Sequence, residues 1–266
     1  MTLTFGADGA PGAALEPVTI SALEYDVLWE QLGLQLMPLV LKVPSPGRTH
    51  TERTELADQA WRSLADRGLG RPHELDPRLE SLLRLLDRPD READGRFGAN
   101  RSVRWLGASR GEDAVLATLD RRGLTLREAA ATGLAREVVS GLPAIPAGPG
   151  ESVTLPSEKL DAAAENAHTT EEFEAELVAR GIRPRDAQVL GSTVLRVKRQ
   201  GQFGAAVRDK WGRRHRARRV IGFFDTEDGR YLQLRRPAPD SSAWTTISPA
   251  DNRLIAHELA TVLDET

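Results

Sequence analysis

Two five-residue motifs recur in the chain in the same order, and this repetition is the strongest constraint on its fold. GRFGA at 95–99 returns as GQFGA at 201–205, and EPVTI at 16–20 returns as ESVTL at 151–155. Such echoes indicate two degenerate copies of one supersecondary unit. The two spacings, 106 and 135 residues, also predict extra residues in the first copy. Chance similarity in a chain rich in Ala, Gly and Arg is the alternative.

Composition narrows the class of protein. The chain has 266 residues, of which 40% are hydrophobic, enough for one large core or two small ones. It has no cysteine, which excludes disulfides, thiolate nucleophiles and Cys-based zinc sites. The net charge of −3 implies no general attraction to nucleic acid. No signal peptide is evident, and the longest apolar stretch is too short to span a bilayer. We therefore expect a soluble cytoplasmic protein.

Helix-start signals open each half of the chain. Capping boxes predict helices that begin at Ser21 and Thr49 in the first half and at Thr169 in the second. Asp76–Pro77 predicts a further helix start, followed by a stripe of leucines at 79, 82, 83 and 86. Ser248–Pro249 predicts the cap of the last helix. LMPLVLKV at 36–43 has the pattern of a buried strand.

Short β-like runs follow the helices in each half. In the first half they are GRFGA, SVRWL and AVLATL, and in the second TVLRVKRQGQFGAAV, RRVIGFF and RYLQLRR. Hairpin signals separate them, such as DTEDG at 225–229. Gly123 and Gly229, each just after an apolar run, are again 106 positions apart and support the repeat. Runs of strands joined by hairpins predict an α+β fold with an antiparallel sheet.

A Pro/Gly-rich segment divides the chain. PAIPAGPG at 143–150 has the composition of a linker. It predicts an N-terminal half at 16–142 and a C-terminal half at 151–266. Residues 1–15, rich in Gly, Ala and Pro, are expected to be a disordered tail.

Recognisable catalytic and cofactor motifs are missing. GASRG at 107–111 matches the nucleophile elbow, but that motif needs a helix after it, and here the strand-like AVLATL follows. Ser109 is therefore expected to be an exposed hairpin residue, with a hydrolase as the weakest alternative. No histidines are spaced for a metal, and no Walker or dinucleotide motif occurs. We expect no enzyme activity, no metal and no cofactor.

One tract is strongly basic. Residues 208–219 read RDKWGRRHRARR, in which eight of twelve residues are Arg, Lys or His. Three hypotheses fit this tract: a solvated loop between two strands, a loop that binds a protein partner, or a nucleic-acid site in which Trp211 stacks on bases.

Three stretches of the chain resemble the EspG family: the opening VTISALEYDVLWEQLGL…MPLVLKVPSPGRT, the segment GRYLQL and the close AWTTISPADNRLIAHELATVLDE. These proteins are secretion-associated chaperones of the ESX (type VII) systems of actinobacteria. The resemblance is collinear over nearly the whole chain after residue 15. It implies a quasi-two-fold α+β fold, with a central antiparallel β-sheet and flanking helical bundles.

The resemblance also implies a function. EspG proteins bind the PPE protein of a PE–PPE heterodimer in the cytosol, cover its apolar tip, keep it soluble and deliver it for export. They are not enzymes. On this resemblance the partner is a PPE protein, neither nucleic acid nor a membrane, and a homodimer is possible when no client is bound. A nucleic-acid-binding protein that uses the tract at 208–219 is the alternative function.

By resemblance, the binding face is the sheet of the second half with the adjacent helices, aided by a loop of the first half. Exposed aromatic and arginine side chains make natural binding hot spots. The predicted partner-binding residues are Arg101, Arg104, Trp105, Phe203, Trp211, Arg213, Arg214, Arg216, Phe223, Tyr231, Gln233 and Arg235. Alternatively, Phe203, Phe223 and Phe224 are core residues. Because strand side chains alternate, Phe223 and Phe224 face opposite sides, so one of them is expected in the core.

Overall fold

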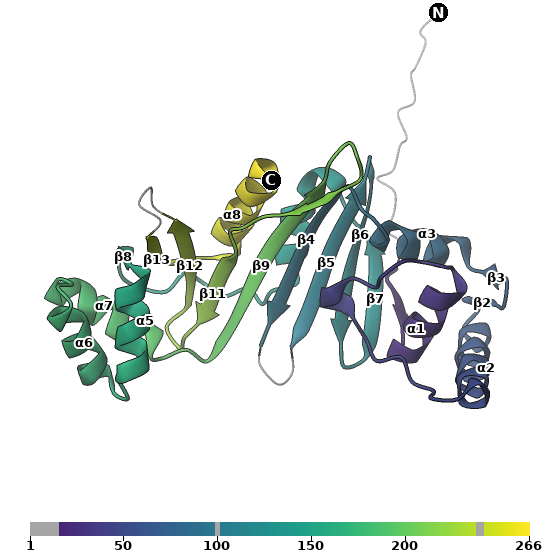
Figure 1. Cartoon of the computed structure of the whole chain (residues 1–266), viewed down its shortest axis with the longest axis horizontal. Helices are drawn as coiled ribbons and strands as arrows, with labels where there is room; N and C mark the ends of the chain where they lie inside the picture. The colour runs from purple at the N-terminus through teal and green to yellow at the C-terminus, as the bar shows by residue number, and fades with distance from the viewer. Residues whose placement is uncertain (1–15, 99–101, 238–241) are drawn as a thin grey trace, which may run out of the picture.

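One large antiparallel sheet runs the length of the molecule, with helices grouped at both ends (Figure 1). The structure is a computed structural model and describes residues 16–98, 102–237 and 242–266. The first half contributes β1 (Val18–Ile20), β4 (Arg91–Phe97), β5 (Val103–Arg110), β6 (Asp113–Asp120) and β7 (Gly123–Glu128). The second half contributes β8 (Val153–Pro156), β9 (Arg199–Arg208), β10 (Arg214–Arg216), β11 (Ile221–Asp225), β12 (Arg230–Pro237) and β13 (Ala243–Pro249).

The strand order shows the expected two-fold repeat. Across the sheet it runs β1-β7-β6-β5-β4-β9-β11-β12-β13-β8, with β10 paired to β9 beside this path. Each half therefore runs from its short first strand at the outer edge to its first long strand, β4 or β9, at the centre. The outer edges match in detail, since the hydroxyls of Thr19 and Thr125 lie 2.9 Å apart, as do those of Thr154 and Thr246. The predicted α+β architecture is confirmed.

The repeated motifs meet at the centre of the sheet. β4 and β9 pair antiparallel, with Arg96 opposite Gln202 and with Gly95 and Phe97 opposite Phe203 and Gly201. Positions 96 and 202 are also 106 apart, the spacing of the repeat itself. The pseudo-two-fold axis therefore passes between Arg96 and Gln202. The two repeated motifs lie on equivalent strands, which pair with each other.

The glycine echo, by contrast, is coincidental. Gly123 begins β7, whereas Gly229 precedes β12. In the sheet the counterpart of β7 is β13, so the two glycines are not equivalent. The equal spacing fails because the connection from β9 to β11 is longer than the one from β4 to β5, which shifts all later positions of the second half.

Two three-helix lobes cover the ends of one face of the sheet, which we call the lobe face. The first lobe is α1 (Ala22–Gln31), α2 (His50–Asp66) and α3 (Pro77–Leu86), with the small β2 (Gly70–Arg71) and β3 (Glu74–Leu75) pair. The second is α5 (Ser157–Asn166), α6 (Thr170–Ala179) and α7 (Pro184–Val194). On the other face, α4 (Leu134–Val139) and α8 (Asn252–Glu265) pack together over the centre. Each lobe and this helix pair encloses its own apolar core.

Most predicted helix starts are confirmed by their caps. Ser21, Thr49 and Thr169 accept hydrogen bonds from the backbone N–H three residues on, and Asp76 caps α3, whose four predicted leucines are buried. The last cap is wrong. Asp251 caps α8, because Ser248 and Pro249 still belong to β13 and pair with β12.

The apolar run at 36–43 was expected to be a buried strand, and the structure corrects this. It contains only a short 3₁₀ turn, η1 (Leu39–Leu41). Pro38 supplies no N–H for a sheet. Leu36 and Leu39 are 95% and 80% exposed, while Val40 and Leu41 are buried against the first lobe. A second turn, η2 (Ala131–Gly133), leads into α4.

The Pro/Gly-rich segment joins the halves but is held by the second one. Ala147 bridges to Arg230, and the Arg230 N–H donates to the Pro146 carbonyl at 2.9 Å. The tail at 1–15 lies outside the described residues. None of the helices in the described ranges is long and apolar enough to cross a membrane.

Candidate functional site

The open surface of the molecule is the middle of the lobe face. One row of residues crosses it, one from each successive strand: Arg104, Arg96, Gln202, Gly222 and Gln233. Beyond each end of the row the sheet is covered by a lobe: Leu119, which pairs with Arg104, and Ile247, which pairs with Gln233, are both buried. We call these five residues the central row. Arg96 and Gln202 are exposed, so the row is the floor of a space between two walls of helices.

The central row is cationic on one side of the axis and neutral on the other. Burial and the neighbouring Arg96 guanidinium lower the pKa of Arg104 below its ordinary value. Arg104 donates to the Lys42 carbonyl at 3.1 Å, which fixes it against the first lobe. Across the axis, Gln202 and Gln233 are uncharged, and Gly222 between them has no side chain. The second half can therefore be approached closely without burying a charge.

Four predicted contact residues are in the core instead. Trp105, Phe203 and Phe223 are at most 2% exposed and lie on the opposite face of the sheet from the central row. Their rings form a stack under α4 and α8, with Phe203 at 6.1 Å from Trp105 and 5.4 Å from Phe223. Tyr231 is 3% exposed. Each of the four side chains fills an apolar layer between sheet and helices.

The core alternative for the phenylalanines is correct and extends further than expected. Phe223 and Phe224 point to opposite faces, yet both are buried, because each face of the sheet carries helices at this point. Phe224 stacks on Tyr231 at 5.5 Å within the core of the second lobe. The Tyr231 hydroxyl donates to the Pro149 carbonyl at 3.0 Å.

The remaining predicted residues fall in two places. Gln233 and Arg235 lie on β12 beside the second lobe, where Arg235 forms an ion pair with Asp161 of α5 at 2.7 Å. The hairpin formed by β9 and β10, at the centre of the strand order, carries the predicted residues Trp211, Arg213, Arg214 and Arg216. Arg101 lies outside the described residues.

The basic tract is a structured hairpin rather than a free loop. Arg214 and Arg216 pair with Glu92 and Asp94 of β4. To reach Asp94, the Arg216 guanidinium crosses β9 over Gly204, where a Cβ would overlap it. The second glycine of GQFGA therefore leaves room for this ion pair.

Ser109 carries no sign of a nucleophile. It was expected to be exposed but is only 3% exposed, inside β5, and the turn after it leads into strand β6. A nucleophile elbow needs an exposed side chain and a following helix. No group of three His, Asp or Glu residues in the described part of the chain could hold a metal ion.

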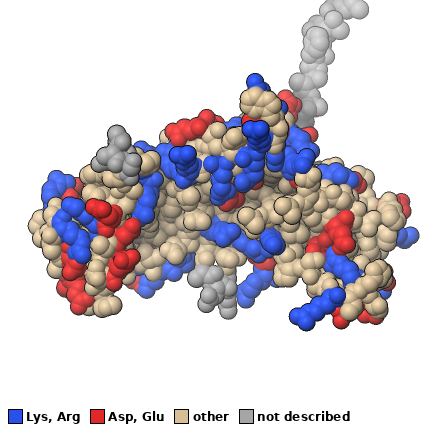
Figure 2. All heavy atoms as spheres, in the orientation of Figure 1, with Lys and Arg blue, Asp and Glu red and all other residues tan. Residues whose placement is uncertain are grey.

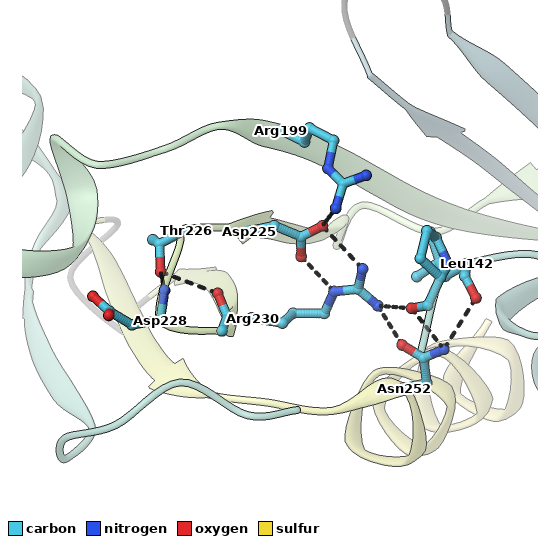
Figure 3. A network of polar contacts seen from close by, with 9 residues as sticks. Leu142, Arg199, Asp225, Thr226, Asp228, Arg230 and Asn252 are labelled. Carbon is cyan, nitrogen blue, oxygen red and sulfur yellow. Dashed lines mark hydrogen bonds and ion pairs between the residues drawn. The ribbon is translucent and has the colours of Figure 1, made fainter. Parts of the chain in front are cut away.

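The most deeply buried charge belongs to a structural network (Figure 3). The Arg230 guanidinium, fully buried, donates to Asp225 at 2.6 and 3.1 Å and to the Pro143 carbonyl at 3.2 Å. Asn252 at the start of α8 accepts a further bond from it. The network joins the β11–β12 hairpin, the segment between the halves and α8, and presents no open polar group to a ligand.

The sequence-based prediction of binding residues missed Arg96 and Gln202, although both lie in the repeated motifs GRFGA and GQFGA. GRFGA and GQFGA differ only in this second letter. The letter in which the copies differ is the one exposed on the axis, whereas the shared Gly and Phe are packed. A difference between repeats at a position predicted to point away from the core is a signal that could have found them.

Comparisons with known proteins agree with this fold. The model of the EspG family matches residues 21–261. Among solved structures, the chain is similar to the Mycobacterium tuberculosis type VII secretion system chaperone EspG5, solved in complex with a PE25–PPE41 dimer. The TM-score is 0.73 at 17% identity, over 94% of this chain and 96% of that one. No match was found among curated proteins.

Proposed function

The chain belongs to the EspG family, and from that premise we propose that it is a type VII secretion chaperone for a PPE protein of a PE–PPE heterodimer. In this role it covers the apolar tip of the PPE protein, keeps the pair soluble and delivers it for export. It acts in the cytoplasm, by binding alone and without catalysis. The observation that carries the proposal is the uncovered middle of the lobe face, a floor open between two helical walls.

The second half of this floor suits an apolar client. A helical tip that seats on Gln202, Gly222 and Gln233 buries no charge, and exposed charges would otherwise have to be desolvated. Leu195 and Val197, where α7 leads into β9, are 39% and 36% exposed and add apolar surface to the second half. Covering an exposed apolar patch on a client prevents its aggregation.

The test is a client-binding comparison in which two charges are added to the floor. Gln202→Glu with Gln233→Glu should raise the Kd for a co-purified PE–PPE pair at least tenfold, roughly the effect of one hot-spot residue. Gln59→Glu on the outer surface of α2 is the matched control and should bind as the unmodified chain does. Unchanged affinity in the double variant, with its melting temperature also unchanged, would place the client elsewhere.

Without a client, the neutral floor and the exposed Leu195 and Val197 are free to self-associate, so we also propose a weak homodimer. Light scattering of the client-free chain over a range of concentrations measures this, and a strictly monomeric protein would reject it.

A further inference from the structure

A second surface lies at the first-lobe end of the lobe face. It is a groove of about 560 Å³ between the β9–β10 hairpin and the 35–40 segment of the first lobe. Arg208, Arg214 and Arg216 line one side, and Leu36 and Leu39 the other. We call it the hairpin groove. Figure 2 shows Lys and Arg side chains gathered over the upper middle of the molecule, where Figure 1 draws the end of β9.

The cations of this region exceed the acids that face them. Arg88, Arg96 and the three hairpin arginines line the groove, against Asp87, Glu92 and Asp94. In the turn of the hairpin, Lys210 and Arg213 form no ion pair with the described acids, and Asp209 pairs with His215. The Arg208 guanidinium donates to the carbonyls of Pro89 and Gly212 and forms no ion pair among the described residues. The carboxylates of Glu92 and Asp94 are occupied by ion pairs with the hairpin arginines, so the remaining cations make the surface positively charged.

The apolar side of the groove has no partner either. Leu36 and Leu39 are the two most exposed large apolar side chains of the described chain, at 95% and 80%. They stand on a segment held from below by Val40 and Leu41, so they are presented on an anchored turn. Apolar side chains presented beside unpaired cations fit a segment that carries both leucine-like and acidic side chains.

We propose that the hairpin groove binds an acidic amphipathic segment of a second protein, distinct from the client proposed on Gln202, Gly222 and Gln233. Its carboxylates meet the hairpin cations and its apolar side chains cover Leu36 and Leu39. Nucleic acid fits the groove less well. It offers no aliphatic side chains to cover Leu36 and Leu39, and Trp211 already carries the Lys210 ammonium 4.5 Å over its ring, which obstructs base stacking.

The test needs no knowledge of the natural partner. The probe is a fluorescein-labelled peptide, LEELLEELLEELLE, followed by fluorescence anisotropy with the full chain. The unmodified chain should bind it, and the charge-free peptide LQQLLQQLLQQLLQ and the apolar-free peptide SEESSEESSEESSE should each bind about tenfold more weakly. The result does not depend on the proposed client, because no client is present.

Variants assign the site. Leu36→Ser with Leu39→Ser should weaken binding of the acidic peptide about tenfold, and Arg208→Gln with Arg213→Gln by a similar factor. Leu195→Ser with Val197→Ser, and Arg62→Gln with Arg121→Gln, are matched controls on other surfaces and should leave the affinity unchanged. Because Leu36 and Leu39 are almost fully exposed, their variant is expected to fold normally.

Three outcomes would overturn the proposal. The first is no binding of the acidic peptide at about 1 mM. The second is full affinity in the Leu36→Ser, Leu39→Ser variant. The third is a DNA duplex that binds more tightly than the peptide, with a steep dependence on salt and no dependence on Leu36; that result would assign the hairpin to nucleic acid.

Discussion

At the scale of single residues, Arg230 shows how a buried charge holds the two halves together. Its guanidinium has no access to solvent and is divided between Asp225, Asn252 and the Pro143 carbonyl. Such a group stabilises a fold only while every partner is in place, because each unpaired buried charge carries a desolvation penalty. The network therefore specifies one arrangement of hairpin, connecting segment and α8.

Replacing Arg230 with methionine should lower the free energy of unfolding by about 3–5 kcal/mol, since Asp225 would stay buried without its main partner. Urea denaturation measures this. Arg235→Met is the control: its ion pair with Asp161 is half-exposed, and its loss should cost less than about 1 kcal/mol. Equal effects of the two variants would contradict the structural role of the network.

Glu24 is expected to contribute to the pH below which the first lobe loses stability. Burial raises the pKa of this carboxyl, but hydrogen bonds from the Ser21 backbone, Ser63 and Arg67, together with the Arg67 charge, outweigh burial and leave the pKa below its ordinary value. A lowered folded-state pKa means that the unfolded chain binds the proton more readily. The stabilisation is therefore present above the unfolded value, about 4.3, and is lost as the pH falls below it.

The unfolding free energy should thus fall as the pH drops from about 5 to 3, and Glu24→Gln should flatten part of this fall while lowering stability at pH 7. Urea midpoints across this range provide the measurement, with Glu55→Gln on the exposed face of α2 as the control. A Glu24→Gln curve parallel to that of the unmodified chain would show that this carboxyl does not contribute to the loss of stability at low pH.

At the scale of elements, the two repeated strands are a self-complementary pair. Gly95 lies under the Phe203 and Trp105 rings, and a Cβ there would overlap Phe203. The equivalent Gly201 lies under Phe223, with a Cβ position 2.6 Å from the Arg96 carbonyl oxygen. Each glycine thus makes room for aromatic rings of the stack, which explains why both copies of the motif contain Gly and Phe.

Gly95→Ala should therefore lower the free energy of unfolding by about 1–3 kcal/mol through overpacking. Gly133→Ala is the matched control, because the nearest atom to its Cβ position is 3.5 Å away. Thermal melting compares the two. A Gly95→Ala protein as stable as the control would mean that the aromatic stack yields without penalty.

How far the sequence predicts each element depends on whether its signal is local. The caps at Ser21, Thr49 and Asp76 follow from side chain and backbone within four residues and are correct. The run at 36–43 was misjudged because its apolar residues are divided between core and solvent, which composition does not reveal. The same reason explains Phe223 and Phe224: two helical layers bury both, and only the tertiary arrangement shows both layers.

At the scale of the whole molecule, the pseudo-two-fold shape and its asymmetric charge are the basis of the two proposed binding surfaces. The backbone repeats across the axis, but Arg96 and Arg104 on one side face Gln202 and Gly222 on the other. The β9–β10 hairpin adds further cations at the first-lobe end. One fold thereby offers a neutral seat beside the second lobe and a cationic groove beside the first.

The most direct test of the central proposal is co-expression of the chain with the PE–PPE pair encoded nearest to it, followed by size exclusion with light scattering. The account predicts one stable species that contains the three chains in a 1:1:1 ratio. Elution of a soluble PE–PPE pair apart from the chain, with no mixed species at micromolar concentration, would contradict it.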